Sequence, residues 1–318
     1  MTVWLLTDAA MDEHASPGHP ERPDRRGVAA DGVRDAAGEA LVEPAVESID
    51  RATLEAIHDP AYLDLLDEAA QHGGGWLDAD TYVVPGSVRA AELAAGATLQ
   101  AALAAATGAA EVAFAVVRPP GHHATRERGS GFCLVNNVAV AVAGLRARGV
   151  AQRIAIIDWD VHHGDGTQAI FDADRGLCYA STHQSPFYPG TGHRAETGSG
   201  LAAGTKHNRP LPADSGDDAF TAAWQEDLVP AIEAFGPDAL LVSAGYDAHV
   251  DDPLAGLGVT EEGYEEVAMH VGALSRRLGL DGVALTLEGG YGLAALRGSV
   301  AATVRGILAG RTSETVRV

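Results

Sequence analysis

The sequence predicts an α/β fold in which a mostly parallel sheet carries helices on both faces, and three observations support this. Apolar runs such as Ile154–Ile157 have the composition of strands buried on both faces. Along the chain, such runs alternate with polar loops and with longer segments that favour helix. The 318 residues are 46% hydrophobic, which is enough for one large core. We therefore predict a single domain spanning residues 1–318.

The expected elements follow one another in a regular order. We expect strands over residues 1–7, 111–117, 154–158, 176–182, 238–243 and 282–287. A Pro-rich loop leads into a helix whose first turn suits Pro23, and two short helices occupy residues 50–72. Further helices are expected over the Ala-rich residues 86–107, after the loop 125–137 up to Arg148, and over 217–235, 260–279 and 293–308. Residues 183–207 are expected to form a long loop and residues 309–318 a flexible tail.

The composition of the chain argues against several classes of function. A formal net charge of −22 repels nucleic acid and anionic membranes, and its simplest interpretation is that it keeps the protein soluble. The chain contains no run of 18 or more apolar residues, so we expect no membrane span. The N-terminal segment turns acidic at once, so we do not expect a signal peptide. Cys133 and Cys178 are too few for a disulfide framework, and we expect a cytoplasmic protein.

Polar residues gather where four of the predicted strands end. The loops that follow these strands span residues 118–123, 158–165, 244–249 and 288–292. The carboxyl ends of parallel strands border a common crevice, which is where α/β proteins bind ligands. The loop 158–165 alone holds three carboxylates and two imidazoles, more polar groups than a packed core could bury without partners. We therefore expect one site at this edge of the sheet.

Three of these side chains have the chemistry of metal ligands. In extended chain, Asp160 and His162 point to the same side, so that a carboxylate and an imidazole can meet at one point. Asp247 is the best third ligand, and oxygen and nitrogen ligands suit a catalytic zinc ion. The alternative interpretation is an acidic helix N-terminus at residues 158–165 and a helix-capping role for Asp247.

A histidine pair and a tyrosine could supply acid–base chemistry. His122 and His123 titrate near neutrality, and both can face one site only if the chain turns at Gly121. Asp158 and Asp165 remain available to orient the two imidazoles once Asp160 is assigned to the metal. Tyr291, on a loop between glycines, could donate a hydrogen bond to a developing oxyanion. Ordinary loop histidines and a tyrosine packed over a turn are the alternatives.

Other polar residues have weaker interpretations. Cys133 could be a nucleophile paired with a histidine, but the metal hypothesis explains more of the sequence. We expect the remaining loop histidines to form hydrogen bonds rather than to bind a metal: His14, His19, His58 and His183.

Five blocks of the sequence together resemble the zinc-dependent histone deacetylase superfamily, which includes acetylpolyamine amidohydrolases and bacterial histone-deacetylase-like amidohydrolases. They are Arg118-Pro-Pro-Gly-His-His-Ala124, Gly131-Phe-Cys133, Asp158-Trp-Asp-Val-His-His-Gly-Asp-Gly166, Ala244-Gly-Tyr-Asp-Ala-His249 and Glu288-Gly-Gly-Tyr291. They occur in the family's order and, with the His19-Pro-Glu block, span almost the whole chain. The segment 247–254 is similar to that of class II members.

The resemblance implies a fold, a set of ions and an activity. The fold would be arginase-like, with a central sheet of about eight strands. Zinc would be bound by Asp160, His162 and Asp247, and a potassium ion by backbone carbonyls of Asp158, Asp160 and His162, near Ser181. The activity would be deacetylation of acyl-lysine in proteins or peptides, or of acetylated polyamines, in a protein that could be a homo-oligomer. A non-catalytic acyl-lysine binder and an arginase-like enzyme with two manganese ions are the alternatives.

The resemblance also assigns substrate contacts. Phe132, with Gly131, would line the tunnel for the acyl-lysine side chain. Polyamine-selective relatives carry an acidic residue at the tunnel mouth, and the matching position here is Leu254, seven residues after Asp247. This difference favours a lysine deacetylase. Arg209 replaces a residue that is more often apolar in the family, which puts the local strand in doubt.

Overall fold

The computed structural model describes residues 1–313, and within them eight parallel strands form one sheet. From one edge to the other, the strands are β2 (Leu41–Val42), β1 (Val3–Leu6), β5 (Val112–Ala115), β10 (Val283–Leu287), β9 (Ala239–Ala244), β6 (Ile154–Asp158), β7 (Leu177–Gln184) and β8 (Lys206–Leu211). The predicted parallel sheet of about eight strands is confirmed. A short antiparallel hairpin, β3 (Gly75–Trp76) and β4 (Tyr82–Val83), lies apart from it.

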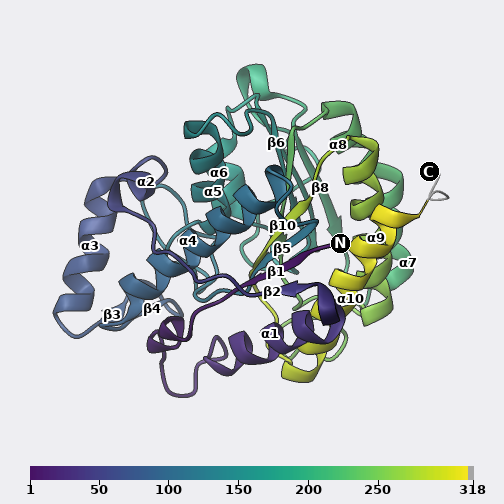
Figure 1. The fold of residues 1–318 in the computed structure, drawn as a ribbon. Coiled ribbons are helices and arrows are strands. Elements are labelled where there is room, and N and C mark those ends of the chain that lie inside the picture. Colours follow the sequence, from purple (N-terminus) through teal and green to yellow (C-terminus); the bar gives the residue numbers. More distant parts are fainter. Residues whose placement is uncertain (314–318) are drawn as a thin grey trace.

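Helices cover both faces of the sheet (Figure 1). The α-helices of the described residues are α1 (Asp24–Ala37), α2 (Arg51–Glu55), α3 (Pro60–Gln71), α4 (Ser87–Ala106), α5 (Asn137–Ala147), α6 (Asp165–Phe171), α7 (Asp217–Ala222), α8 (Val229–Phe235), α9 (Glu261–Arg277) and α10 (Leu293–Thr312). Of these, α2 and α3 lie beside the sheet, where they contact α5 and α4. Alternate strand residues serve the two faces: Ile154 and Ile156 join the core under α4 and α5, whereas Ala155 and Ile157 join the core under α9 and α10. Burial on both faces explains why these strands are continuous apolar runs.

Several parts of the fold differ from the prediction, and the two-residue strands β2, β3 and β4 were not predicted. Residues 206–211, placed partly in the loop, form the edge strand β8, and its doubtful member Arg209 pairs with Asp227 at the protein surface. The helix predicted over 217–235 contains a π-helical stretch at Ala223–Leu228 just before Pro230, whose ring nitrogen cannot donate the usual backbone hydrogen bond. The last helix continues to Thr312, so residues 309–312 of the predicted tail are helical. Residues 314–318 lie outside the described residues.

Among residues 1–313, one helix, α10, is long and apolar enough to cross a membrane by length and composition alone. The apolar window of this helix is 61% buried inside the protein. It packs against α9 and α1, as a core helix does, and its apolar character is explained by that packing.

Candidate active site

A cavity of about 230 Å³ opens at the carboxyl ends of the strands. Asp160 follows β6, Gly289 follows β10 and His122 lies beyond β5, so neighbouring strands deliver these residues to one place. The lining residues are Asp80, Pro120, His122, His123, Gly131, Phe132, Asp160, His162, Tyr188, Leu254, Gly289 and Tyr291.

Asp160, His162 and Asp247 meet beside this cavity, and each offers one ligand atom within 4.8 Å of the other two. The Nδ1 atom of His162 lies 3.1 Å from Oδ1 of Asp160 and 3.3 Å from Oδ2 of Asp247. Burial lowers the pKa of His162, but hydrogen bonds and charges from the two carboxylates outweigh it and raise this pKa to about 10. Two carboxylates and one imidazole therefore enclose a point of strongly negative potential.

The second oxygen of Asp247 shows that this arrangement fits a metal ion. Oδ1 accepts a hydrogen bond from the N–H of Val161 at 2.9 Å, whereas the buried Oδ2 has only the polar contact with Nδ1 of His162 at 3.3 Å, a nitrogen that it shares with Asp160. A buried carboxylate oxygen whose one polar contact is long and shared is poorly stabilised, and a bound cation would remove that cost. Glycine is required around it, because a Cβ atom at Gly289 would lie 2.0 Å from Oδ2 of Asp247. The oxygen–nitrogen–oxygen set suits zinc.

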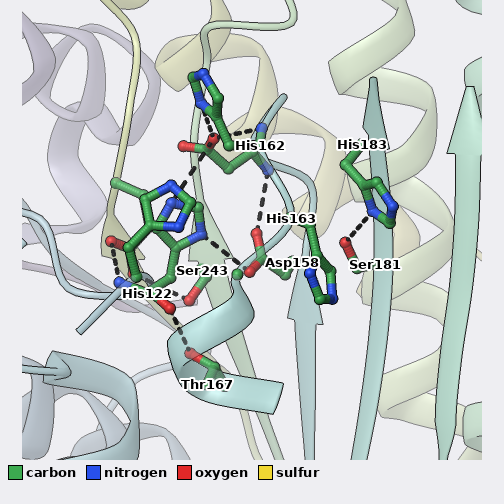
Figure 2. A network of polar contacts seen from close by, with 12 residues as sticks. His122, Asp158, His162, His163, Thr167, Ser181, His183 and Ser243 are labelled. Carbon is green, nitrogen blue, oxygen red and sulfur yellow. Dashed lines mark hydrogen bonds and ion pairs between the residues drawn. The ribbon is translucent and has the colours of Figure 1, made fainter. Parts of the chain in front are cut away.

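The histidine pair lies against this cluster, and each imidazole has its own carboxylate. Nδ1 of His122 is 3.1 Å from Oδ2 of Asp158, and Nδ1 of His123 is 2.7 Å from Oδ1 of Asp165. Figure 2 shows His122 directed at Asp158, whose Oδ2 also accepts the hydroxyl of Tyr179 at 2.9 Å. Because both Nδ1 atoms are used in this way, the Nε2 atoms remain for chemistry.

The pKa values of the two imidazoles are shifted in opposite directions. Burial lowers the pKa of both, but the charges of Asp160 and Asp158 outweigh burial at His122 and raise its pKa well above the ordinary value. Burial and the neighbouring His122 lower the pKa of His123 to about 4. These opposite shifts in pKa favour His123 as the proton acceptor of the pair and His122 as its proton donor.

The turn that brings both histidines to one side is held from behind by Glu288. The chain turns as predicted, with the N–H of Ala124 donating to the carbonyl of Gly121 at 3.0 Å. Gly121 is needed for close packing, since a Cβ there would lie 2.5 Å from the backbone nitrogen of Asn137. The buried carboxylate of Glu288 accepts the N–H groups of Gly121 at 2.6 Å and of His122 at 3.2 Å. Its other oxygen accepts the hydroxyl of Ser243 at 3.0 Å.

Tyr291 lines the cavity on a loop that hydrogen bonds hold in place. Its N–H donates to Oδ2 of Asp252 at 2.6 Å, and the guanidinium of Arg25 lies 4.7 Å from its ring centroid. Arg25 also donates to the carbonyl of Gly290 at 2.6 Å. Burial raises the pKa of Tyr291 well above its usual value, so its hydroxyl keeps its proton and can act as a donor.

An aromatic wall narrows the cavity on the other side. Gly131 and Phe132 both have positive φ angles, 54° and 69°, which aim the Phe132 ring across the cavity, 5.8 Å from the ring of Tyr291. A Cβ at Gly131 would lie 2.5 Å from Cδ2 of His123, so only glycine fits there. Tyr188, which is 44% exposed, faces His123 edge-on at 5.1 Å. The cavity is thus a slot for an extended, mainly apolar group.

The structure brings together all the candidates that the sequence singled out for the site. Asp158, Asp165 and Asp247 lie behind the lining residues, and the other eight line the cavity. Cys133 is buried nearby, and burial raises the pKa of its thiol well above normal, which disfavours the thiolate that a nucleophile needs. His58 and His183 form hydrogen bonds to backbone carbonyls, as expected.

Several supporting residues were missed by sequence reasoning. Tyr188 at the mouth lies in the predicted 183–207 loop, where the Phe187–Tyr188 pair was an available signal. Glu288 and Asp252 belong to the blocks 288–292 and 247–254, but no local pattern shows which backbone groups they hold. Glu21 and Arg118 form a buried ion pair at 2.6 Å across 97 residues of chain, which a single sequence cannot reveal.

Comparisons with known proteins agree with this geometry. Residues 19–307 match the model of the histone deacetylase domain. A probable deacetylase of Archaeoglobus fulgidus is 39% identical over 314 residues, which cover 97% of this chain and 86% of that protein. The crystal structure of the HDA15 HD domain superposes with a TM-score of 0.89 at 35% identity, covering 99% of this chain and 91% of that one. An acetylpolyamine aminohydrolase from Burkholderia pseudomallei superposes with a TM-score of 0.87 at 29% identity, covering 96% and 98%.

Proposed function

The chain belongs to the histone deacetylase family, and on that premise we propose that it is a zinc-dependent hydrolase that removes acetyl groups from lysine side chains in proteins or peptides. The observation that carries the proposal is the convergence of ligand atoms from Asp160, His162 and Asp247, with Oδ2 of Asp247 lacking a well-formed hydrogen bond, beside a cavity lined by a histidine pair and a tyrosine. A zinc ion held by these three ligands would supply Lewis acidity to the substrate carbonyl and to a water molecule.

The protein groups then divide the proton transfers between them. Neutral His123, oriented by Asp165, accepts a proton of the attacking water at Nε2. Charged His122, held by Asp158, delivers a proton to the leaving amine. The hydroxyl of Tyr291 donates to the carbonyl oxygen as that oxygen gains negative charge. The products are a free amine and acetate.

The substrate assignment rests on the mouth of the cavity. Leu254 lines it and offers no charge to the distal ammonium of a polyamine, which favours an acetyl-lysine side chain. Hydrolysis of acetylated polyamines is the second candidate, because Asp80 also lines the cavity and carries a carboxylate. Assays of acetyl-lysine peptides and acetylpolyamines side by side separate the two.

Three secondary features complete the proposal. A potassium ion would be held by the carbonyls of Asp158, Asp160 and His162, and the pairing of Asp158 with Ser181 between β6 and β7 brings Ser181 beside them. We propose the cytoplasm as the compartment, since both cysteines are free thiols. Neither nucleic acid nor a membrane is a proposed partner, given the net charge of −22, and self-association remains part of the hypothesis.

Two variants test the metal and the oxyanion roles separately. In Asp247→Ala, both bound zinc and turnover should fall, because one of three ligands is lost. In Tyr291→Phe, turnover should fall by roughly 100-fold or more while bound zinc is unchanged. Tyr264→Phe is the matched control, since the hydroxyl of this buried tyrosine has no hydrogen-bond partner. Full activity in both Asp247→Ala and Tyr291→Phe would show that the proposed roles of these two residues are wrong.

The same measurements address the two alternative classes. A non-catalytic acyl-lysine binder would release no acetate at any zinc concentration. An arginase-like enzyme would contain manganese, which metal analysis of the purified protein detects, and Tyr291→Phe would then leave its turnover intact.

A further inference from the structure

Lys206, the first residue of the edge strand β8, is completely buried although it takes no part in the site. Its ammonium donates to the carbonyl oxygen of Leu177 at 2.9 Å, to the carbonyl oxygen of Asp174 at 3.3 Å and to Oγ1 of Thr205 at 2.7 Å. All three of its N–H donors are therefore used by uncharged oxygens. Buried charges in proteins are usually paired with an opposite charge, so this environment calls for an explanation.

The nearest acidic side chain does not serve as a counter-ion. The carboxylate of Asp174 forms an ion pair with Arg146 and accepts the N–H of Gly176 at 2.8 Å, while only the backbone carbonyl of Asp174 faces Lys206. The hydroxyl of Thr205 donates its own proton to the carbonyl of Ala202 at 2.8 Å, which leaves a lone pair for the ammonium. Each neighbour thus presents the negative end of a dipole, without a full charge.

A cradle of backbone carbonyls and a hydroxyl is the kind of surrounding in which proteins hold a monovalent metal cation such as K⁺. An ammonium group and K⁺ carry the same charge and have similar sizes, so one can replace the other among such ligands. We propose that Leu177, Asp174 and Thr205 form a monovalent-cation site that this protein fills permanently with the ammonium group of its own Lys206. This site is separate from the one proposed at Asp158, Asp160 and His162.

The ammonium group of Lys206 lies where it can hold two segments of the chain together. It joins the turn between α6 and β7 to the start of β8, where the sheet ends. Two residues further along β7, Tyr179 donates its hydroxyl to Asp158, the partner of His122. Burial lowers the pKa of Lys206 to about 8, so the group still carries its charge at neutral pH. Because the cation is covalently attached, this edge of the sheet keeps it whatever salt is present.

Two substitutions of Lys206 test the proposal through thermal unfolding of the full chain. Lys206→Met fills the space of the aliphatic stem but removes the charge, and Lys206→Ala removes both and leaves room for an ion. Wild type and both variants are melted in choline, sodium, potassium and ammonium chloride at equal ionic strength. Each variant is compared with wild type in the same salt, so that any potassium effect at another site cancels.

In choline chloride, both variants should melt about 4 °C or more below wild type, because the cradle oxygens lose their donor. Potassium or ammonium should restore part of this loss in Lys206→Ala in a concentration-dependent way, as an ion that binds only the folded state must. Neither should restore Lys206→Met. A Lys206→Met protein as stable as wild type, or a Lys206→Ala deficit equal in all four salts, would overturn the proposal. If Lys206→Ala does not fold in choline chloride, the yield of refolded protein is measured in each salt instead. Equal yields in choline chloride and ammonium chloride would then overturn the proposal.

Discussion

The carboxylate of Asp252 accepts the backbone N–H of Tyr291 at 2.6 Å, and thereby fixes the residue proposed to stabilise the oxyanion. The same oxygen accepts the N–H of Gly292 at 3.1 Å, and the other oxygen accepts the N–H of Leu254 at 3.0 Å. One buried side chain thus sets the positions of the proposed catalytic tyrosine and of the residue at the cavity mouth. We regard Asp252 as a positioning residue, which acts through Tyr291 and not on the substrate.

Asp252→Asn should lower kcat by about 10- to 100-fold, because hydrogen bonds to a charged acceptor contribute about 1.5–3 kcal/mol. Bound zinc should stay the same, since no metal ligand is changed. In the double variant with Tyr291→Phe, kcat should be no lower than in Tyr291→Phe alone, because both changes remove the same contribution. The exposed neighbour Asp251→Asn is the control. Losses that simply multiply in the double variant would contradict a role through Tyr291.

Asp165→Asn should weaken His123 as a base. Asp165 raises the pKa of His123 against the stronger lowering effect of burial, so its loss should move that pKa further below about 4. A base is active above its pKa, and the acid limb of the kcat/KM profile should therefore shift to lower pH, while the rate at neutral pH falls because a weaker base accepts the proton. Stopped assays from pH 3 to 9 give both readouts. An acid limb that stays in place would remove Asp165 from this role.

Glu21→Gln tests a buried ion cluster that supports the site. Glu21 accepts hydrogen bonds from Arg118 at 2.6 Å and from Arg25 at 3.0 Å, and the charges of the two arginines outweigh burial and lower its pKa to about 2. Since the pKa is depressed on folding, the stabilisation is present above pH 4.5 and is lost as pH falls toward 2. By linkage it amounts to roughly 3 kcal/mol.

Urea unfolding at several pH values from 7 to 3 measures this contribution. Glu21→Gln should be less stable at pH 7 by about 3–5 kcal/mol, because two buried arginines lose their counter-charge. Its stability should also depend less on pH below 4.5 than that of wild type. The exposed Glu39→Gln serves as control. Equal acid sensitivity of Glu21→Gln and wild type would show that Glu21 is not the titrating group.

The sequence allowed the prediction of the parts of the fold that have a local signature. The strand Ile154–Asp158 and the polar residues after it form a continuous pattern, and so the site could be located before the structure. The edge strand β8 was missed because Lys206, Arg209 and Pro210 break its apolar pattern at the end of the sheet. Glu21 and Asp252 could not be assigned, since each acts on residues distant in sequence that only the fold brings near.

Removal of the metal should abolish turnover. Dialysis against a chelator should leave a folded but inactive protein, and added zinc should restore activity, because Lewis acidity is part of the proposed chemistry. Circular dichroism and metal analysis accompany the assay. Activity that survives after the zinc content has fallen to background would reject the zinc proposal.

The last prediction concerns the choice between lysine and polyamine substrates. Leu254 lines the cavity and cannot pair with a second positive charge on the substrate. A charged hydrogen bond contributes about 1.5–3 kcal/mol, so its absence should cost polyamines roughly 10- to 100-fold in kcat/KM. Leu254→Glu should therefore shift selectivity toward acetylspermidine, and Leu254→Gln, which has a similar size but no charge, should shift it far less.

Asp80 could favour polyamine substrates instead, because its carboxylate lines the same cavity. It could attract the distal ammonium of a polyamine even though residue 254 is an uncharged leucine. Asp80→Asn separates the two possibilities. If Asp80 binds the distal ammonium of a polyamine, this variant should lose acetylspermidine activity selectively. If the protein is a lysine deacetylase, the rates of the variant with peptides and with polyamines should change together. The proposed substrate class is wrong if the wild type hydrolyses acetylspermidine with a higher kcat/KM than any acetyl-lysine peptide in the same panel.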